Sequence, residues 1–483
     1  MLPLGEPNRQ RGPLCLKFER SAFHNEPPTG EMRMKTLALF LLALLGAALP
    51  AAAAEDPVLD WNAIALAAVA ADHAGSFEQG GPARTARALA IVHAAIYDAA
   101  LVVERRQPHP ISLAAAVATA GHDALANLYP SQQASFDAAL AQDLAAVTSE
   151  PGLRVGARVG ARAARRALRQ RRHDGSDAAM PWTQSSAPGR HREDPLHPGQ
   201  GFLGAGWGDV EPFVLRRSDQ LRPPPPPALD SAEYTAAFDE VKRLGGDGVT
   251  TPTERSAEQT EIGVFWAYDG TPGLGPPLRL YNQIARAIAG QQGNDAFANA
   301  RLFLIVNLAL ADAGIACWEA KYHYDFWRPV VAIREAEPGT GPSGLGDGNP
   351  LTTGDPSWTP LGAPASNQSG TDFTPPFPAY PSGHATFGAA LFRILERFYG
   401  TDAIAFSFVS DELNGVTADW AGNVRPLAER SFETLSEAMW ENAESRIYLG
   451  IHWSFDASEG VALGQAVADY VFDHALTRRG RRR

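Results

Sequence analysis

The chain has 483 residues and a formal net charge of −12, with 45% hydrophobic and 20% charged residues. This length and composition are typical of a soluble globular protein with a large core, built as two domains or one double-sized domain. The acidic balance argues against nucleic acid as the main partner, because binding to a phosphate backbone needs a basic face.

The first fifty residues follow the pattern of a secretory signal peptide behind an unusual extension. A positive segment, Met32-Arg33-Met34-Lys35, precedes a short apolar run at 37–49 and small residues at 51–54. The run is too short to span a bilayer as a stable helix. We therefore expect residues 1–31 to be a doubtful extension and residues 32–54 a signal peptide. The mature protein would be secreted or periplasmic, with no membrane association after cleavage.

Apolar residues spaced by three or four dominate the first half of the mature chain, as in amphipathic helices. Proline, glycine or asparagine separates the periodic segments. Residues 55–172 are therefore predicted to form an N-terminal helical bundle. Its expected helices are 60–75, 84–103, 111–128, 132–148 and 152–171.

Residues 173–230 are rich in glycine, proline, histidine and aspartate, which predicts an irregular crossover or linker. Helical periodicity then resumes, and residues 231–476 are predicted to form a second bundle, followed by a basic tail at 477–483. Strand-like alternation is almost absent. The predicted fold is all-α, with two packed helical bundles and long Gly/Pro-rich loops. The expected helices of the second bundle are 231–244, 256–268, 277–290, 296–326, 384–399, 427–448 and 457–475.

Two segments of the second bundle are candidates for an anion-binding site. One supplies cations, and the other supplies backbone N–H groups. Lys321 and Arg328 are seven residues apart, so they are expected on one face near the end of helix 296–326. Ser382-Gly383-His384 opens a helix, where unpaired backbone N–H groups can hold an anion. Each segment also has an ordinary explanation, since cations balance a helix dipole and serine is a common N-cap.

A third segment carries Arg446, His452 and Asp456. Asp456 is placed to accept a hydrogen bond from one ring nitrogen of His452 and so to fix its tautomer. A lone His–Asp pair is more often structural, but three such segments in one bundle predict a tetrahedral oxyanion site. The three cations would neutralise the oxyanion. One histidine would attack or ligate its central atom, and the other would act as general acid or base.

The motifs Lys321-x6-Arg328-Pro329, Pro381-Ser382-Gly383-His384 and Ser445-Arg446-x5-His452-x3-Asp456 resemble a known signature. It is the three-part signature of the superfamily of vanadium haloperoxidases and type 2 phosphatidic acid phosphatases. The resemblance implies an all-α fold in which one pocket serves two chemistries. It also implies that His452 is the axial ligand of vanadium, that His384 assists acid–base steps, and that the equatorial oxygens are held by Lys321, Arg328, Ser382, Gly383 and Arg446.

Residues outside the signature resemble the chloroperoxidase branch. In segment 265–270, Asp269 matches a carboxylate that braces the vanadate-binding arginine, here Arg446. Trp318 and Phe377 match aromatic residues on the halide side of the pocket. Algal bromoperoxidases tend to carry histidine at the Phe377 position.

The resemblance therefore implies a haloperoxidase with vanadate as its cofactor. Its substrates would be hydrogen peroxide, chloride and/or bromide, and an organic acceptor. One alternative is a secreted acid phosphatase of the same superfamily, in which His452 is phosphorylated and Asp456 orients it. Another is a non-catalytic protein that only binds an oxyanion.

Overall fold

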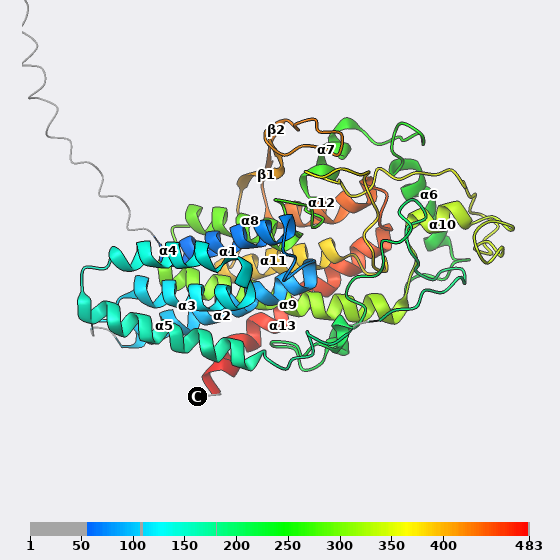
Figure 1. Ribbon diagram of the computed structural model, residues 1–483. Helices are drawn as coiled ribbons and strands as arrows, with labels where there is room; N and C mark the ends of the chain where they lie inside the picture. Colours follow the sequence, from blue (N-terminus) through cyan, green and yellow to red (C-terminus); the bar gives the residue numbers. More distant parts are fainter. Residues whose placement is uncertain (1–55, 107–109, 180, 482–483) are drawn as a thin grey trace, which may run out of the picture. The chain divides into compact units, whose positions relative to one another are not determined.

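The computed structural model describes residues 56–106, 110–179 and 181–481, so the predicted extension and signal peptide lie outside the described residues. The described part is mostly helical, which confirms the predicted fold class, and it includes one two-stranded antiparallel sheet. The helices and strands in chain order are α1 (Pro57–Ala74), α2 (Pro82–Arg105), α3 (Leu113–Leu128), α4 (Gln133–Ala145), α5 (Glu150–Gln170), α6 (Ala232–Leu244), α7 (Ala257–Phe265), α8 (Pro277–Gln291), α9 (Ala296–Tyr324), α10 (Pro329–Glu335), α11 (Gly383–Tyr399), β1 (Phe406–Asn414), β2 (Leu427–Phe432), α12 (Leu435–Tyr448) and α13 (Ser454–Arg481) (Figure 1).

Helix α9 lies at the centre of the core and packs against α2, α11 and α13 (Figure 1). Almost every residue from Leu302 to Lys321 is buried, as expected for a helix that is apolar around its whole circumference. Within the described ranges, α2 and α9 are long and apolar enough to cross a membrane, but most of their surface is buried inside the protein. This burial is what a core helix requires.

One hydrophobic cluster joins helices from both halves of the chain. Helices α2 and α9 pack directly together, and the residues from Asp56 onwards group into one compact unit. The proposed domain boundaries at 172 and 231 stay predictions. The segment between them is irregular, as expected, but hydrogen bonds connect it to α9. The buried carboxylate of Asp312 accepts hydrogen bonds from three successive backbone N–H groups, those of Phe213, Val214 and Leu215.

The end of α9 differs from the sequence prediction. The helix ends at Tyr324, because Asp325 adopts a left-handed conformation with φ of 53°. Arg328 is extended, with ψ of 154°, as expected for a residue that precedes proline, and Pro329 begins α10. The prediction that Lys321 and Arg328 share one helical face is therefore wrong. The chain turns between them and brings both side chains to the site from different directions.

The predicted helix 427–448 is also partly wrong. Residues 427–432 form strand β2, which pairs with β1, and α12 begins only at Leu435. The alternation of Phe406-Ser407-Phe408 was a local signal for the first strand, since it places two aromatic rings on one face. The hairpin lies beside α7 and α8 (Figure 1).

Helices α11 and α13 pack closely, and this contact aligns two of the segments that carry polar site residues. A Cβ atom at Gly464 of α13 would lie 2.2 Å from the backbone oxygen of Thr386 in α11. We predict that Gly464→Ala lowers the free energy of unfolding by about 1–3 kcal/mol, because the helices must separate. Gly290→Ala in α8 is the control, since a Cβ there meets nothing within 4 Å. Denaturant unfolding should show a loss only for the first variant, and equal midpoints would contradict this packing.

Candidate active site

The ends of four helices, the turn before α10 and three loops bring all the predicted site residues to one buried place. Trp318 and Lys321 come from α9, Arg328 from the turn before α10, and Arg446 from the end of α12. Ser382, Gly383 and His384 begin α11, and Asp456 lies in the first turn of α13. Phe377, Asp269 and His452 lie on the intervening loops. Their functional roles stay predictions.

Lys321 is fully buried, with its ammonium group in the interior. Nζ donates hydrogen bonds to the carbonyl oxygens of Pro378 and Ala379, at 2.7 and 3.0 Å. It also lies 5.1 Å from the ring centre of Phe377, within cation–π range. Burial lowers the pKa of Lys321 to about 7, and the Arg328 charge contributes in the same direction. The charge of this side chain therefore changes near neutral pH.

The two arginines are only partly satisfied by protein groups. Arg328 donates from Nε to the carbonyl of Phe377 at 2.9 Å and from Nη1 to that of Ile451 at 2.8 Å. Arg446 uses Nη2 alone, which donates to both carboxylate oxygens of Asp269 at 2.7 and 2.8 Å. Among the described residues, Nη2 of Arg328 and both Nε and Nη1 of Arg446 are buried without a partner. Buried donors of this kind are costly unless an anion accepts from them.

His452 is held in one tautomer. Asp456 Oδ2 lies 2.8 Å from Nδ1, and Nη1 of Arg328 donates to Nε2 at 2.9 Å. Because an arginine can only donate, Nε2 must carry the lone pair and Nδ1 the proton. Burial and the three neighbouring cations hold the pKa of His452 well below its usual value. The imidazole is therefore neutral, with its nucleophilic nitrogen among the cations.

Asp456 links the His452 loop to the start of α11. Its Oδ2 also accepts from the backbone N–H of Trp453 at 3.0 Å, and its carbonyl accepts from the N–H of Ser382 at 2.9 Å. Burial raises the pKa of Asp456 to about 7. The Ser382 hydroxyl caps α11 by accepting from the N–H of Ala385. The N-terminus of α11 thus lies beside the His452–Asp456 pair.

His384 follows Gly383 in the first turn of α11. Its Nε2 donates to the carbonyl of Ala267 at 2.6 Å, which leaves the lone pair on Nδ1. Burial, with the nearby Arg446 charge, holds the pKa of His384 well below 6.5. This histidine is also neutral and can accept a proton at Nδ1.

The loop segment 265–269 contacts both His384 and Arg446. Its Ala267 carbonyl accepts from His384, and its Asp269 carboxylate accepts from Arg446. Its residue Tyr268 is buried in a left-handed conformation with φ of 46°. Strand β1 fixes this loop, since Ser410 donates to the Phe265 carbonyl at 2.6 Å and Glu412 accepts from the Tyr268 N–H at 3.2 Å. Glu412 is not among the residues predicted from the sequence. No local pattern identifies it, because its partner lies 144 residues away.

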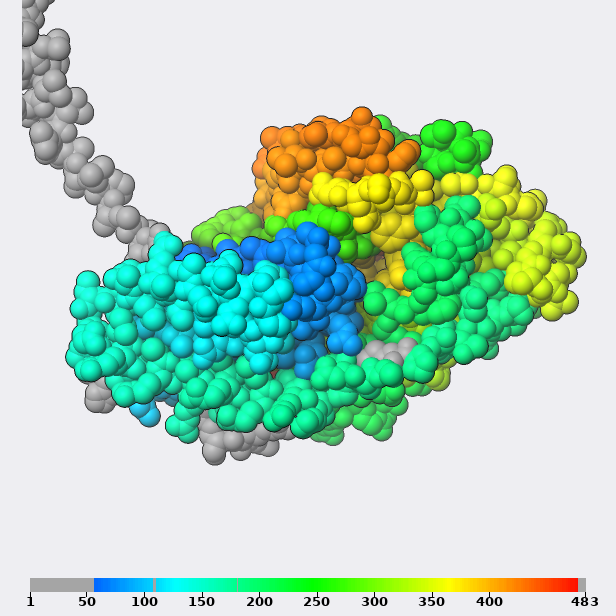
Figure 2. All heavy atoms as spheres, viewed as in Figure 1, coloured from blue at the N-terminus to red at the C-terminus, as the bar shows by residue number. Residues whose placement is uncertain are grey.

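The site opens into a cavity of about 210 Å³. Trp318 and Phe377 form one wall, with ring centres 4.9 Å apart. His73, at the end of α1, and Phe77, after it, also line the cavity, so the predicted N-terminal bundle contributes to it. No motif in the sequence marks these two residues. Figure 2 shows the N-terminal helices, in blue, next to green and yellow parts of the chain.

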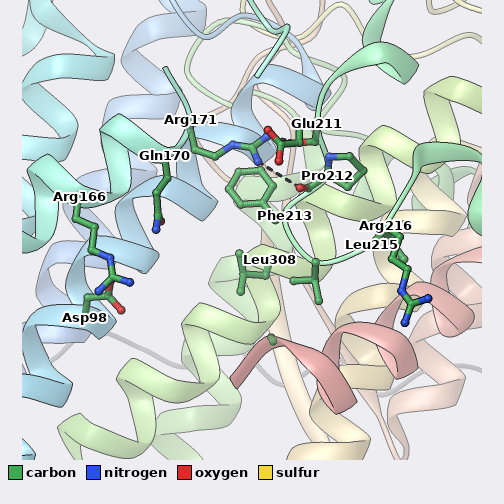
Figure 3. Close-up of a pocket in the computed structure, with 12 residues that line it drawn as sticks. Asp98, Arg166, Gln170, Arg171, Glu211, Pro212, Phe213, Leu215, Arg216 and Leu308 are labelled. Carbon is green, nitrogen blue, oxygen red and sulfur yellow. Dashed lines mark hydrogen bonds between the residues drawn. The ribbon is translucent and has the colours of Figure 1, made fainter. Parts of the chain in front are cut away.

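A larger cavity, of about 310 Å³, lies elsewhere, between α5, the segment 211–216 and α9 (Figure 3). Its most buried cation, Arg171, is already satisfied by the carboxylate of Asp174 and the carbonyls of Glu211 and Pro212. The Arg171 guanidinium also stacks on the ring of Phe213, as Figure 3 shows. This cavity contains no counterpart of the unpartnered donors around His452, so we assign the chemistry to the smaller one.

Comparisons with known proteins found related sequences and structures. A family model described as the VCPO second helical-bundle domain matches residues 301–480. The vanadium chloroperoxidase of Curvularia inaequalis is 40% identical over 289 residues, which cover 52% of this chain and 46% of that protein. The chain thus spans about half the length of this curated relative.

Two crystal structures share the fold. A bacterial vanadium-dependent iodoperoxidase aligns with a TM-score of 0.68 at 22% identity, covering 86% of this chain and 96% of that chain. The holo form of a bacterial vanadium-dependent chloroperoxidase aligns with a TM-score of 0.56 at 16% identity, covering 88% and 94% respectively.

The ion pair between Asp269 and Arg446 gives a stability prediction. Both side chains are almost completely buried. We predict that Asp269→Asn lowers the free energy of unfolding by about 3–5 kcal/mol, because it leaves a buried guanidinium charge without its counter-ion. Asp239→Asn, at an exposed position of α6, should change it by less than about 0.5 kcal/mol. Chemical denaturation of the two variants measures the difference, and equal losses would contradict the pairing.

The shifted pKa values of Lys321 and Asp456, both about 7, predict how anion affinity depends on pH. As pH rises through 7, Lys321 loses its positive charge and Asp456 gains a negative one, so both changes disfavour an anion. Sulfate keeps a constant charge in this range. Its affinity should fall between pH 6 and 8, by up to about tenfold per pH unit for each proton taken up on binding.

Titration calorimetry with sulfate at several pH values measures this dependence. Lys321→Met should bind sulfate more weakly at pH 6 and retain only the part of the pH dependence that arises from Asp456. An affinity that is flat or rises across this range would show that these groups do not face the bound anion.

Proposed function

Because the chain belongs to the vanadium haloperoxidase family, we propose that it is a vanadate-dependent peroxidase that oxidises a halide with hydrogen peroxide. One observation carries the proposal. Among the described residues, three buried guanidinium nitrogens of Arg328 and Arg446 lack partners, and another nitrogen of Arg328, Nη1, donates to the lone pair of His452 Nε2. The oxidised halogen would then pass to an organic acceptor.

The donor set fits vanadate. Three cations and a neutral imidazole suit a multiply charged oxyanion with a central atom that accepts a nitrogen ligand. In this proposal Lys321, Arg328 and Arg446 would neutralise the oxyanion, and the Ser382 hydroxyl and the Gly383 backbone N–H would add donors. His452 Nε2 would supply the nitrogen ligand, and Asp456 keeps the imidazole in the required tautomer through the hydrogen bond to Nδ1.

Vanadate, when bound, supplies the Lewis-acid centre that activates hydrogen peroxide towards attack by halide. The protein supplies the proton transfers. His384 is neutral, and its Nδ1 can take a proton from incoming peroxide. The proton is then available for the oxygen that leaves when the halide is oxidised. The Ala267 carbonyl keeps the other ring nitrogen protonated throughout.

The wall formed by Trp318 and Phe377 supports a halide site beside the cations. The ammonium of Lys321 lies 5.7 Å from the Trp318 ring centre and 5.1 Å from that of Phe377. Apolar rings beside a cation favour a weakly hydrated anion, and we propose chloride and/or bromide. The signal-peptide pattern at 32–54 further leads us to propose that the enzyme acts outside the cytoplasm.

A halogenation assay tests the proposal. Purified protein given vanadate, peroxide and bromide should halogenate a dye acceptor, and activity should require vanadate. His452→Ala should abolish it, since the axial ligand is lost. His384→Ala should lower kcat by about 10²–10⁴-fold, the usual contribution of a general acid–base group. His323→Ala, at an exposed position of α9, should retain wild-type activity.

The acid phosphatase alternative uses the same residues, with His452 Nε2 attacking phosphorus. It is tested with an aryl phosphate in the absence of vanadate. Hydrolysis of the aryl phosphate without any halogenation would overturn the haloperoxidase proposal. Anion binding with neither activity would leave the non-catalytic alternative.

A further inference from the structure

The mouth of the cavity carries an exposed aromatic side chain in an unusual backbone conformation. Phe77 lies between α1 and α2, is 54% exposed and has φ of 54°. This left-handed conformation costs a residue other than glycine about 1–2 kcal/mol, and the limited burial of an exposed ring offsets little of that cost. Phe77 nevertheless lines the cavity that contains His384 and His452.

The loop that carries Phe77 is held by the buried Asp72. The Asp72 carboxylate accepts from the Ser76 hydroxyl at 2.8 Å and from the backbone N–H groups of Glu78 and Gln79, at 2.6 and 3.0 Å. The Asp72 carbonyl also accepts from the N–H of Phe77 itself at 2.9 Å. These bonds fix the backbone on both sides of the ring, so its position at the mouth is built into the fold.

The side chains around the ring are largely apolar. His73 packs edge-on against Phe77, with ring centres 5.3 Å apart. Both His73 nitrogens are occupied, since Nδ1 donates to the Val69 carbonyl and Nε2 accepts from the Gly81 N–H. Phe373, Pro375 and Pro376 line the same cavity. Among the residues lining it, the only lysine, arginine, aspartate or glutamate side chains are Asp269 and Arg446, which pair with each other.

We propose that this mouth binds an uncharged aromatic acceptor with a single ring, of the phenol class, and holds it for halogenation inside the cavity. The size limits the acceptor to one ring, because an apolar cavity of about 150 Å³ holds benzene and this cavity, which also contains the proposed oxyanion site, measures about 210 Å³. The Phe77 ring offers an aromatic surface. Arg446 pairs with Asp269, and in the proposed function its remaining donors bind the oxyanion, so a neutral acceptor is favoured over an ionic one.

The halogen transfer balances without a further reactant and rests on the proposed function. The hypohalous-acid equivalent formed from halide and peroxide reacts with the ring, so that ArH and HOX give ArX and water. A carbon–halogen bond forms and the halogen–oxygen bond breaks. The ring proton leaves with the hydroxide, and the electron pair of the former C–H bond restores aromaticity. The ring is oxidised and the halogen is reduced.

Competition between two acceptors tests the proposal. A mixture of phenol and 4-hydroxybenzenesulfonate is brominated by the vanadate-loaded enzyme and, separately, by reagent hypobromous acid. The enzyme should favour phenol over the sulfonate by about 2- to 12-fold more than the reagent does, the range expected of one aromatic contact. Phe77→Ala should lower the preference for phenol towards that of reagent hypobromous acid, whereas Phe77→Tyr should retain the wild-type preference. Trp420→Ala, an exposed ring on the β1–β2 connection, should keep the wild-type ratio.

Binding of phenol to vanadate-free protein, measured by calorimetry, gives a readout independent of halogenation. Phe77→Ala should weaken this binding by a similar factor, with a melting temperature that confirms folding. Equal product ratios for enzyme and reagent, or unchanged phenol binding in the folded Phe77→Ala variant, would overturn the proposal. Iodide oxidation without any organic acceptor tests the proposed function separately, because it does not involve the phenol.

Discussion

The burial of Lys321, Arg328 and Arg446 around one small space is the constraint on which the rest of this structure depends. Removing three positive charges from water is expensive, and the protein compensates only in part. Backbone carbonyls satisfy Lys321 and part of Arg328, and Asp269 pairs with Arg446. The remaining donors stay unpartnered within the described residues. This arrangement suits the binding of an anion, because an anion would supply the counter-charge that the protein groups lack.

The same cations set the state of both histidines. Their positive field adds to the effect of burial and keeps His384 and His452 neutral. Which nitrogen keeps its lone pair is then decided by the acceptor on the far side of each ring, a carboxylate for His452 and a backbone carbonyl for His384. The difference suits the two proposed roles. A carboxylate supports a ligand that donates electron density, whereas a carbonyl fixes orientation without adding a charge near the proton-transfer group.

Much of the site geometry depends on contacts between distant parts of the chain. The loop at 265–269 aligns both His384 and Arg446, and strand β1 holds that loop through Ser410 and Glu412. Burial raises the pKa of Glu412 to about 7, and its bond to Arg425 and the Ser366 hydroxyl offsets part of the cost of burying it. The N-terminal helices contribute through the loop after α1, which closes one side of the cavity. The residues from 56 onwards therefore contribute to the site well beyond the matched segment 301–480.

The sequence by itself determined the helices, because their periodicity of three to four residues is a local property and most predicted bounds lie within a few residues of the observed ones. It also identified the polar groups of the site, because Lys321, the Ser-Gly-His turn and the His452–Asp456 pair lie in short motifs with recognisable chemistry. Tertiary structure alone decided how Arg328 reaches the site, since that depends on the left-handed turn at Asp325. It also decided the pairing of β1 with β2, the role of Glu412 and the place of Phe77. Each of these depends on partners or packing far away in the chain, which no local pattern encodes.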